Sequence, residues 1–179
     1  RKWIIVDIGV TFGREDTTPG VDLILPDPTY LEEHKDDIIA IVLTHAHEDH
    51  CGLAKQVRDE AKNAEIHIHE WETGHLFGRL AHDDHRNLMM RSGVPAGVFD
   101  ELRGMYEEIS LLTDSLADGD FHDLEDEMEL EFDGGALRVL HTPGHTPGSC
   151  SFVREADRTL ICGDCVLKRI TPNPIVSPH

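Results

Sequence analysis

The stretch THAHEDH, residues 44–50, contains three histidines and two acidic residues between positions 45 and 50. Imidazole nitrogens and carboxylate oxygens are ligand atoms that zinc and similar divalent cations accept. His45 and His47 are two residues apart, and Asp49 and His50 follow directly. This spacing lets the first pair bind one metal ion and the later pair a second. The alternative is a polar loop in which the histidines have no common role.

Two later motifs carry the same kinds of ligand. The segment HTPGHTPGS (141–149) places His145 in a turn rich in proline and glycine, between two predicted strands. The segment ICGD places Asp164 at the end of another predicted strand. Loops at strand ends commonly carry functional groups, and a carboxylate with two oxygens is suited to bridge two cations in two-metal hydrolysis. We therefore expect His145 and Asp164 to join the residues at 45–50.

Metal ligands need a rigid support, and the sequence predicts one. The run IIAIVLT (38–44), rich in β-branched residues, predicts a buried strand directly before the histidine motif. A helical pattern follows over residues 47–63, and EIHIH (65–69) alternates as a third strand. Strand, helix and strand in this order predict a parallel βαβ unit.

The rest of the chain predicts a layered α/β protein with two sheets and helices outside. A first strand is expected at 2–9, a hairpin near Gly134–Gly135, and further strands at 136–142, 148–153 and 159–164. Residues 71–116 show a mainly helical pattern and are a candidate cap over a pocket. No repeat, linker or change in composition divides the chain, so we expect one domain over residues 1–179.

Taken in order, the motifs THAHEDH, TPGHTPGS and GD resemble the metallo-β-lactamase superfamily, over residues 38–165. This resemblance implies a four-layer αββα sandwich with a dinuclear site at one edge. His45, His47 and His145 would hold the first metal, Asp49 and His50 the second, and Asp164 would bridge both. The family pattern also implies a further histidine ligand downstream. Only 15 residues follow Asp164, with His179 the sole candidate, so we expect the domain to be incomplete at its C-terminus.

Two parts of the chain resemble different branches of this superfamily. The segment GDCVLKRITPNP resembles the hydrolases that include glyoxalase II-like, thioesterase and lactonase enzymes. The stretch from Val6 to His50 resembles the N-terminal part of the ribonuclease J group. The resemblances therefore leave the substrate class open.

The implied cofactors are two divalent ions, with zinc the first choice and iron or manganese accepted by the same ligands. Two such ions hold a hydroxide at neutral pH, which serves as the nucleophile. Asp49 is predicted to be catalytic as well as a ligand, because it is placed to orient this nucleophile and accept its proton. Asp7 and Thr44 are candidates to hold the outward ring nitrogens of the histidines. Their alternative roles are a strand-exit turn and a helix cap.

Other histidines and the cysteines are predicted to have lesser roles. The HDDH segment (82–85) is interpreted as a solvated helical face, and His141 as a strand-end residue near the site. His67 and His69 are expected to face solvent or fill packing positions. Cys51 is expected to pack inward as a small apolar group. Cys162 and Cys165 form a C-x-x-C that we interpret as reduced thiols rather than a redox pair.

The composition limits the partners. The 179 residues carry 35 acids against 16 bases, a net charge of −19, which disfavours broad electrostatic binding of nucleic acid or anionic membranes. No apolar run reaches the roughly 18 residues of a membrane span, and the start lacks the pattern of a signal peptide. We expect a cytoplasmic protein with a small-molecule substrate, and the oligomeric state is not predicted.

Three functions are compatible with these observations. The first is a metal-dependent hydrolase of small ester, thioester or lactone substrates, using a metal-bound hydroxide. The second is a phosphodiesterase or ribonuclease of the same fold. The third is a truncated or engineered domain that binds metal without turnover. Measured metal content and chelator-sensitive turnover separate the three.

Overall fold

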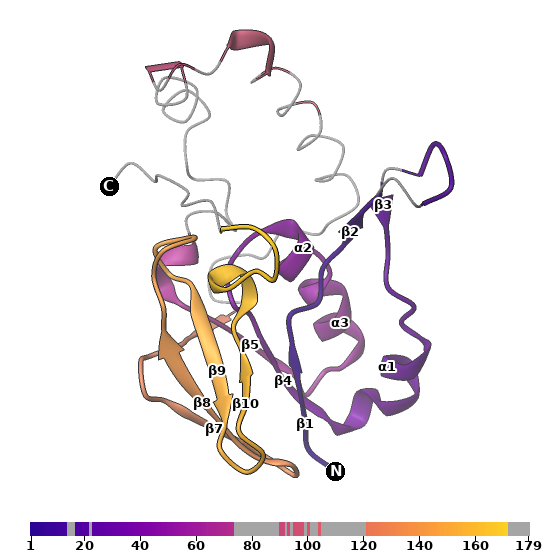
Figure 1. The fold of residues 1–179 in the computed structure, drawn as a ribbon. Helices are drawn as coiled ribbons and strands as arrows, with labels where there is room; N and C mark the ends of the chain where they lie inside the picture. Colours follow the sequence, from indigo (N-terminus) through magenta and orange to yellow (C-terminus); the bar gives the residue numbers. More distant parts are fainter. Residues whose placement is uncertain are drawn as a thin grey trace.

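A computed structural model describes residues 1–13, 17–21, 23–73, 90–91, 93, 95–98, 100, 104 and 121–171. Its core contains two four-stranded sheets placed face to face (Figure 1). The first sheet has the order β1-β4-β5-β6, and all its neighbouring strands are parallel. Its strands are β1 (Trp3–Val6), β4 (Ile38–Val42), β5 (Glu65–Ile68) and β6 (Phe121–Asp123).

The second sheet has the order β10-β9-β8-β7 and is antiparallel throughout. Its strands are β7 (Glu129–Phe132), β8 (Gly135–His141), β9 (Cys150–Arg154) and β10 (Thr159–Ile161). The predicted hairpin is confirmed, since Phe132 pairs with Gly135 where β7 turns into β8. A separate small ribbon pairs β2 (Thr11–Phe12) with β3 (Leu23–Ile24).

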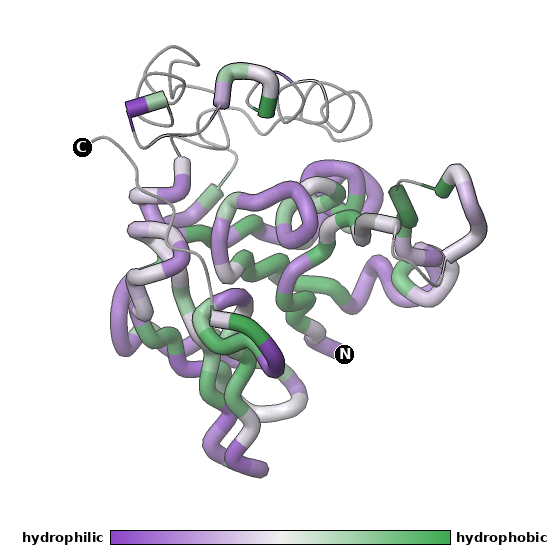
Figure 2. The backbone as a smooth tube through the Cα atoms, turned by 45° about the horizontal axis from the view of Figure 1, so that its top comes forward, coloured by the Kyte–Doolittle hydropathy of each residue, from purple (hydrophilic) through white to green (hydrophobic). Residues whose placement is uncertain are grey.

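Helices cover the outer face of the first sheet. They include α1 (Thr29–His34), α2 (Glu48–Cys51) and α3 (Ala54–Glu60), with short 3-10 turns η1 (Lys35–Asp37), η2 (Glu70–Glu72) and η3 (Gly163–Cys165) elsewhere. One apolar cluster joins α3 to the first sheet, and a second fills the space between the sheets. Figure 2 shows in green the hydrophobic stretches of the chain that contribute to these two clusters. Because β4 is buried on both faces, its sequence is almost continuously apolar.

The parallel βαβ unit is confirmed, but the single helix expected over 47–63 is wrong. The structure divides it into α2 and α3. Backbone hydrogen bonds explain the break. The Leu53 N–H donates to the Ile8 carbonyl at 3.0 Å, and the Ile8 N–H donates to the His50 carbonyl at 2.7 Å. The segment after β1 therefore takes up backbone groups that a continuous helix would have used internally.

The described residues supply three of the four expected layers: helices, first sheet and second sheet. Within them, no helix covers the outer face of the second sheet. Most of the predicted cap at 71–116 lies outside the described residues, although residues 90–91, 96–98, 100 and 104 are helical. The cap and the single-domain organisation therefore stay predictions. No helix among the described residues is long and apolar enough to span a membrane.

Candidate metal centre

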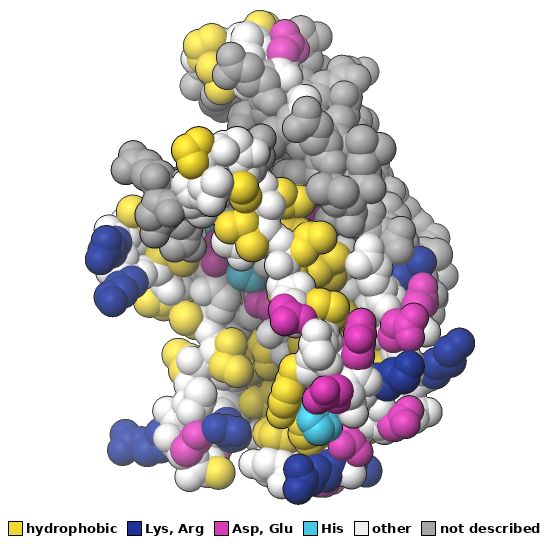
Figure 3. Space-filling model, turned by 90° about the vertical axis from the view of Figure 1, so that its right-hand side faces the viewer, with side chains coloured by type: hydrophobic (Ala, Val, Ile, Leu, Met, Phe, Trp, Pro, Cys, Tyr) yellow, Lys and Arg dark blue, Asp and Glu magenta, His cyan; other side chains and the backbone are white. Residues whose placement is uncertain are grey.

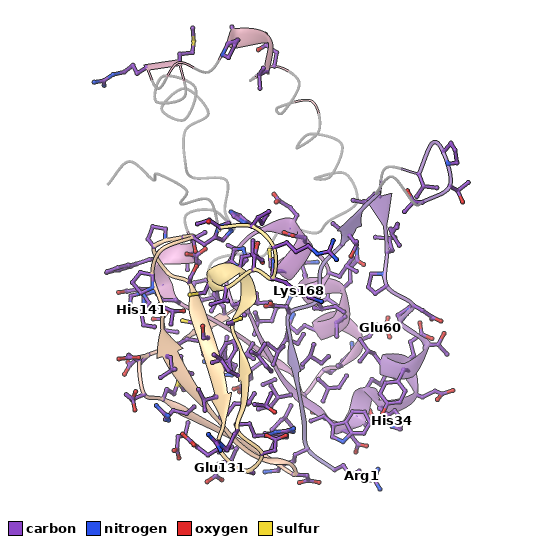
Figure 4. The ribbon with its side chains drawn as sticks, viewed as in Figure 1. Arg1, His34, Glu60, Glu131, His141 and Lys168 are labelled. Atoms are coloured by element: carbon purple, nitrogen blue, oxygen red, sulfur yellow. The ribbon has the colours of Figure 1, made fainter. Side chains whose placement is uncertain are left out.

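Three segments at one rim of the sandwich carry all six predicted metal ligands, with Asp49 and His50 in the helix α2. The first follows β4, the second joins β8 to β9, and the third is the turn η3 after β10. A backbone bond joins the two sheets at this rim, from the Cys150 N–H to the Thr44 carbonyl at 2.8 Å. In Figure 4, His141 and Lys168 lie at the rim end, while Arg1 and Glu131 mark the opposite end.

Three imidazoles meet at the centre of the rim. The Nδ1 atom of His47 is 2.9 Å from Nε2 of His45 and 3.1 Å from Nε2 of His145. The three rings are close to perpendicular, with interplanar angles of 79°, 85° and 88°. The rings are therefore not stacked, and the short distances show that their nitrogens converge. Tetrahedral zinc at 2.0–2.1 Å from each nitrogen spaces its ligand nitrogens about 3.3 Å apart, so these three donors suit such an ion.

A second group of potential ligands adjoins the first and consists of His45, His50 and Asp164. The two oxygens of Asp164 face different histidines. Oδ1 is 3.4 Å from Nε2 of His50, and Oδ2 is 3.7 Å from Nε2 of His145. Both groups contain His45, which is 1% exposed. The shared His45 and the position of Asp164 give two adjacent sets of nitrogen and oxygen donors, as two neighbouring divalent ions require.

Asp49 lies beside the second group but belongs to neither of the two groups. Its Oδ2 is 3.7 Å from Nε2 of His50, and its side chain is 37% exposed. Asp49 is therefore the most open of the predicted ligands. Its position leaves the carboxylate accessible to a substrate or water.

Asp7 and Thr44 contact the outward nitrogens of His50 and His45, which confirms the contacts expected of them. Asp7 Oδ2 is 2.8 Å from Nδ1 of His50. A carboxylate only accepts hydrogen bonds, so this nitrogen carries a proton, and in the neutral ring Nε2 keeps its lone pair. The Thr44 hydroxyl donates to the same Oδ2 at 2.8 Å and lies 3.1 Å from Nδ1 of His45. It can therefore accept from Nδ1 of His45 and leave Nε2 of that ring free for a metal.

The negative charge of Asp7 also affects the titration of His50. Burial acts to lower the pKa of this imidazole, but the hydrogen bond to Asp7 and the nearby carboxylates outweigh it, and the pKa is raised. Asp7 itself has a φ of 56°, in the left-handed region that non-glycine residues rarely adopt. The Thr44 N–H donates to its Oδ1 at 2.7 Å and helps to hold this conformation.

Two glycines let the chain approach the centre closely. Gly163 directly precedes Asp164 with a φ of +47°, and a Cβ there would lie 2.6 Å from the Thr44 hydroxyl oxygen. A Cβ on Gly9 would lie 2.1 Å from the backbone carbonyl carbon of Asp49. Both positions therefore require glycine: Gly163 lets the turn of Asp164 approach Thr44, and Gly9 lets the segment after β1 approach the backbone of Asp49.

Sequence reasoning missed Glu72. This side chain is fully buried at the end of η2, and its two oxygens accept backbone N–H bonds from two different rim loops. The donors are Ala46, at 3.0 Å from Oε2, and Gly148, at 2.7 Å from Oε1. In the sequence, Glu72 is one acid among several after β5, and no local pattern separates it from Glu70.

The remaining sequence expectations have mixed outcomes. His67 is 7% exposed, which confirms a packing position. His69 stacks on His141 at 4.2 Å between ring centroids, and His141 Nε2 is 2.9 Å from the Pro147 carbonyl oxygen.

Cys51 packs against the apolar cluster of the first sheet, and burial raises the pKa of its thiol. All four cysteines are free thiols. The HDDH segment (82–85) and His179 lie outside the described residues.

Comparisons with known proteins place this geometry in a family context. Residues 1–178 match the model of the metallo-beta-lactamase superfamily. A ribonuclease J from Sinorhizobium meliloti is 37% identical over 99 residues, which cover 55% of this chain and 16% of that protein. A probable metallo-hydrolase from Streptococcus pyogenes is 28% identical over 138 residues, which cover 73% of this chain and 48% of that protein.

A solved structure agrees with the fold. The crystal structure of a metallo-beta-lactamase family protein from Thermus thermophilus matches with a TM-score of 0.68 and 26% identity. The match covers 94% of this chain and 52% of the Thermus protein, so this chain spans about half of that relative. The family model, the agreement in fold and the order of the ligand motifs lead to one conclusion: the chain belongs to the metallo-β-lactamase superfamily.

Proposed function

We propose that this chain is a hydrolase that uses two divalent cations. The observation that carries the proposal is the convergence of two groups of potential ligands that share His45, with Asp164 of the second group also facing His145 of the first. In this proposal His45, His47 and His145 would hold one ion, His50 and Asp49 would hold the other, and Asp164 would serve both. When bound, such ions lower the pKa of water toward neutrality and polarise a carbonyl or phosphoryl oxygen. Zinc suits this mixture of imidazole and carboxylate donors best, and iron or manganese suits it next.

The chain's own residues divide the remaining tasks. Asp7 keeps the proton on the outward nitrogen of His50, and Thr44 accepts from the outward nitrogen of His45. Both contacts direct lone pairs toward the centre. Asp49 is the exposed carboxylate at the rim, and its place beside His50 suits it to orient a water molecule and accept a proton from it.

We propose a small ester, thioester or lactone as the substrate. The net charge of −19 opposes attraction of a polyanion. On the face shown in Figure 3, lysine and arginine side chains lie in separate places, several of them beside acidic ones, and form no continuous basic patch over the described residues. A small substrate does not depend on such a patch.

A phosphodiesterase or ribonuclease is the second candidate. One observation favours it: the 37% identity to a ribonuclease J over 99 residues. The same ligand groups would serve this reaction, because two cations stabilise the charge that develops on a phosphoryl group. The choice between the two candidates therefore depends on substrate contacts rather than on the metal centre.

One experiment tests both candidates. The metal content per chain is measured by elemental analysis, and turnover of a thioester, a lactone and bis-p-nitrophenyl phosphate is then measured with and without a chelator. Two ions per chain and chelator-sensitive turnover of the thioester or lactone are expected. Turnover of the phosphodiester alone would favour the second candidate. Bound metal without any turnover would favour a non-catalytic metal-binding domain, and no metal under replete conditions would overturn the proposal.

A matched pair of variants assigns the activity to the rim. His45→Ala should abolish chelator-sensitive turnover, whereas His122→Ala should retain it. His122 lies on β6 and its side chain is 59% exposed, so its loss leaves the rim unchanged. Equal activity in both variants would show that the turnover does not come from this centre.

A further inference from the structure

We propose that Glu72 is a positioning residue that joins the loop of His45 and His47 to the loop of His145. In this way it sets the affinity of these three imidazoles for their ion. The inference rests on the proposed function, because it assumes that the three imidazoles hold a cation. It assigns Glu72 no contact with substrate or metal.

The contacts of Glu72 are shared between the two loops. Its Oε2 accepts from the N–H of Ala46, which lies between His45 and His47 in the sequence. Its Oε1 accepts from the N–H of Gly148, three residues after His145. The distances are 3.0 and 2.7 Å, and hydrogen bonds to a carboxylate are stronger than neutral ones. One side chain therefore fixes the separation of the two loops.

The loop of His145 is stiff enough to pass this constraint on to the imidazole. The Thr146 N–H donates to the Ser149 hydroxyl oxygen at 3.1 Å, and the two hydroxyls are 2.7 Å apart. Thr146 and Ser149 are 1% and 4% exposed, so water does not compete strongly for these bonds. An anchor at Gly148 therefore restrains His145 as well.

The position is specific for a carboxylate in close contact with the loop. A Cβ on Gly148 would lie 2.8 Å from both Cγ and Oε1 of Glu72, so the glycine backbone rests directly on the side chain. Two backbone donors need two acceptor atoms. Glutamine keeps one oxygen but turns an NH₂ donor toward the second N–H, and this leaves two donors facing each other. Glu72→Gln therefore breaks one link while it keeps the size of the side chain.

Glu70 provides the matched control. It lies two residues earlier on the same turn η2 and is exposed. Glu70→Gln changes the net charge by the same amount as Glu72→Gln and occurs on the same element. Any difference between the two variants therefore reports the buried contacts and not the charge.

The test uses Co²⁺ as a probe. The metal-free wild-type chain, Glu72→Gln and Glu70→Gln are each titrated with Co²⁺ and followed by visible absorption. The imidazole NMR signals of His145 and His50 report which group each ion enters. Loss of a partner outside the ligand set typically weakens metal binding about 10–100-fold. We expect a weakening of that size, with altered absorption bands, at the His145 group of Glu72→Gln, and a change of less than about twofold in Glu70→Gln.

Amide hydrogen exchange provides a second readout that needs no metal. Exchange at Ala46 and Gly148 in the metal-free chain should accelerate in Glu72→Gln and stay at the wild-type rate in Glu70→Gln. If Glu72→Gln does not fold, Glu72→Asp takes its place, since it keeps both oxygens but withdraws them by one methylene. The same changes, smaller in size, are then expected.

Two results would overturn the inference. The first is wild-type Co²⁺ affinity and absorption in the Glu72 variant. The second is an equal loss at the His145 and His50 groups that follows a fall in thermal stability, because it would show a purely structural role. Failure of the proposed function is distinguishable. In that case the wild-type chain itself binds no Co²⁺, while the exchange rates still report whether Glu72 joins the loops.

Discussion

Among the residues that the structure describes, two clusters combine several histidines with carboxylates, and only one of them contains groups that could hold a metal ion. The rim cluster comprises His45, His47, His50, His145 and Asp164. The strand cluster comprises His67 on β5, His122 opposite it on β6, and Glu65. Both histidines of the strand cluster approach the same oxygen of Glu65, at 3.7 and 3.8 Å. Residue types and contacts to a shared carboxylate therefore do not separate the two clusters, although only in the rim cluster do sets of three ligand atoms all lie within 4.8 Å of one another.

The support of each ring makes the difference. In the rim cluster, His45 and His50 have their outward nitrogens next to Thr44 and Asp7, which fixes ring orientation and tautomer. In the strand cluster, the buried Nδ1 of His67 has no hydrogen-bond partner. The rings of His67 and His122 lie 5.2 Å apart at 31°, nearly side by side, because neighbouring strands project paired side chains in the same direction. Loops at strand ends aim ligands at one point, whereas paired strand positions do not.

The strongest test of this contrast is His45→Ala. His45 belongs to both ligand groups, so its loss should weaken the binding of both ions. We expect a loss of more than about 100-fold in affinity, beyond the range for residues outside the ligand set. Equilibrium dialysis with elemental analysis measures this. Two tightly bound ions in the variant would show that the rim cluster is not the metal site.

Asp7→Asn should have the next largest effect. The amide would turn a donor toward Nδ1 of His50 or lose that contact, so the ring would no longer be held with Nε2 facing the centre. We expect the ion at His50 and Asp164 to bind about 10–100-fold more weakly, with a smaller change at the His145 group. Co²⁺ titration separates the two events. An equal effect at both groups would contradict a local role for Asp7.

Gly163→Ala should disturb the rim through the backbone. A residue other than glycine at a φ of +47° costs about 1–3 kcal/mol, and the added Cβ would press on Thr44. Gly20→Ala is the matched control, since Gly20 has a φ of +86° but a Cβ there meets nothing within 4 Å. Urea unfolding of the metal-free chains measures both. The two variants should be destabilised, and Gly163→Ala alone should also weaken metal binding.

In the metal-free chain, the contributions of His50 and His67 to folding stability should depend on pH with opposite sign. The pKa of His50 is raised above 6.5 because Asp7 outweighs burial, so its contribution to stability is present below pH 6.5 and lost as the pH rises through the folded-state value. Burial, aided by the nearby His122, lowers the pKa of His67 below 6.5. Stability is therefore lost as the pH falls below 6.5, because the unfolded chain binds the proton more readily.

Unfolding free energies measured between pH 5 and 8 check this expectation. His50→Gln should make stability rise more steeply with pH, and His67→Gln should make the rise less steep. Each change should stay below the limit of about 1.4 kcal/mol per pH unit for one proton. Slopes that change in the same direction in both variants would contradict the opposite pKa shifts of His50 and His67.

The smallest effect is expected for His122→Asn. His122 and Glu65 are 59% and 60% exposed, and exposed ion pairs contribute little to stability. Metal content and affinity should change by less than about twofold. A loss of one bound ion in this variant would show that the strand cluster binds metal after all, and the contrast between the clusters would fail.

The parts that the sequence predicted well follow from local rules. The apolar run before THAHEDH predicted β4, and strand, helix and strand predicted the parallel unit, because periodicity reports which faces are buried. Of the six predicted ligands, five fall in the two ligand groups, and their roles as ligands stay predictions. Asp49 shows the limit of spacing, since it stands one residue from His50 yet lies outside both groups.

The sequence by itself determined the ligand types, the buried strands before them and the acidic balance, because these depend on residue chemistry and local periodicity. Only the tertiary structure decided which nitrogen of His50 faces the centre, where the helix after β4 breaks, and that Glu72 rather than Glu70 joins two loops. These features depend on contacts between residues 26 to 76 positions apart, such as Glu72 with Ala46 and Gly148. Such contacts form only when distant strands pair within the first sheet or the two sheets pack, so no local pattern in the chain records them.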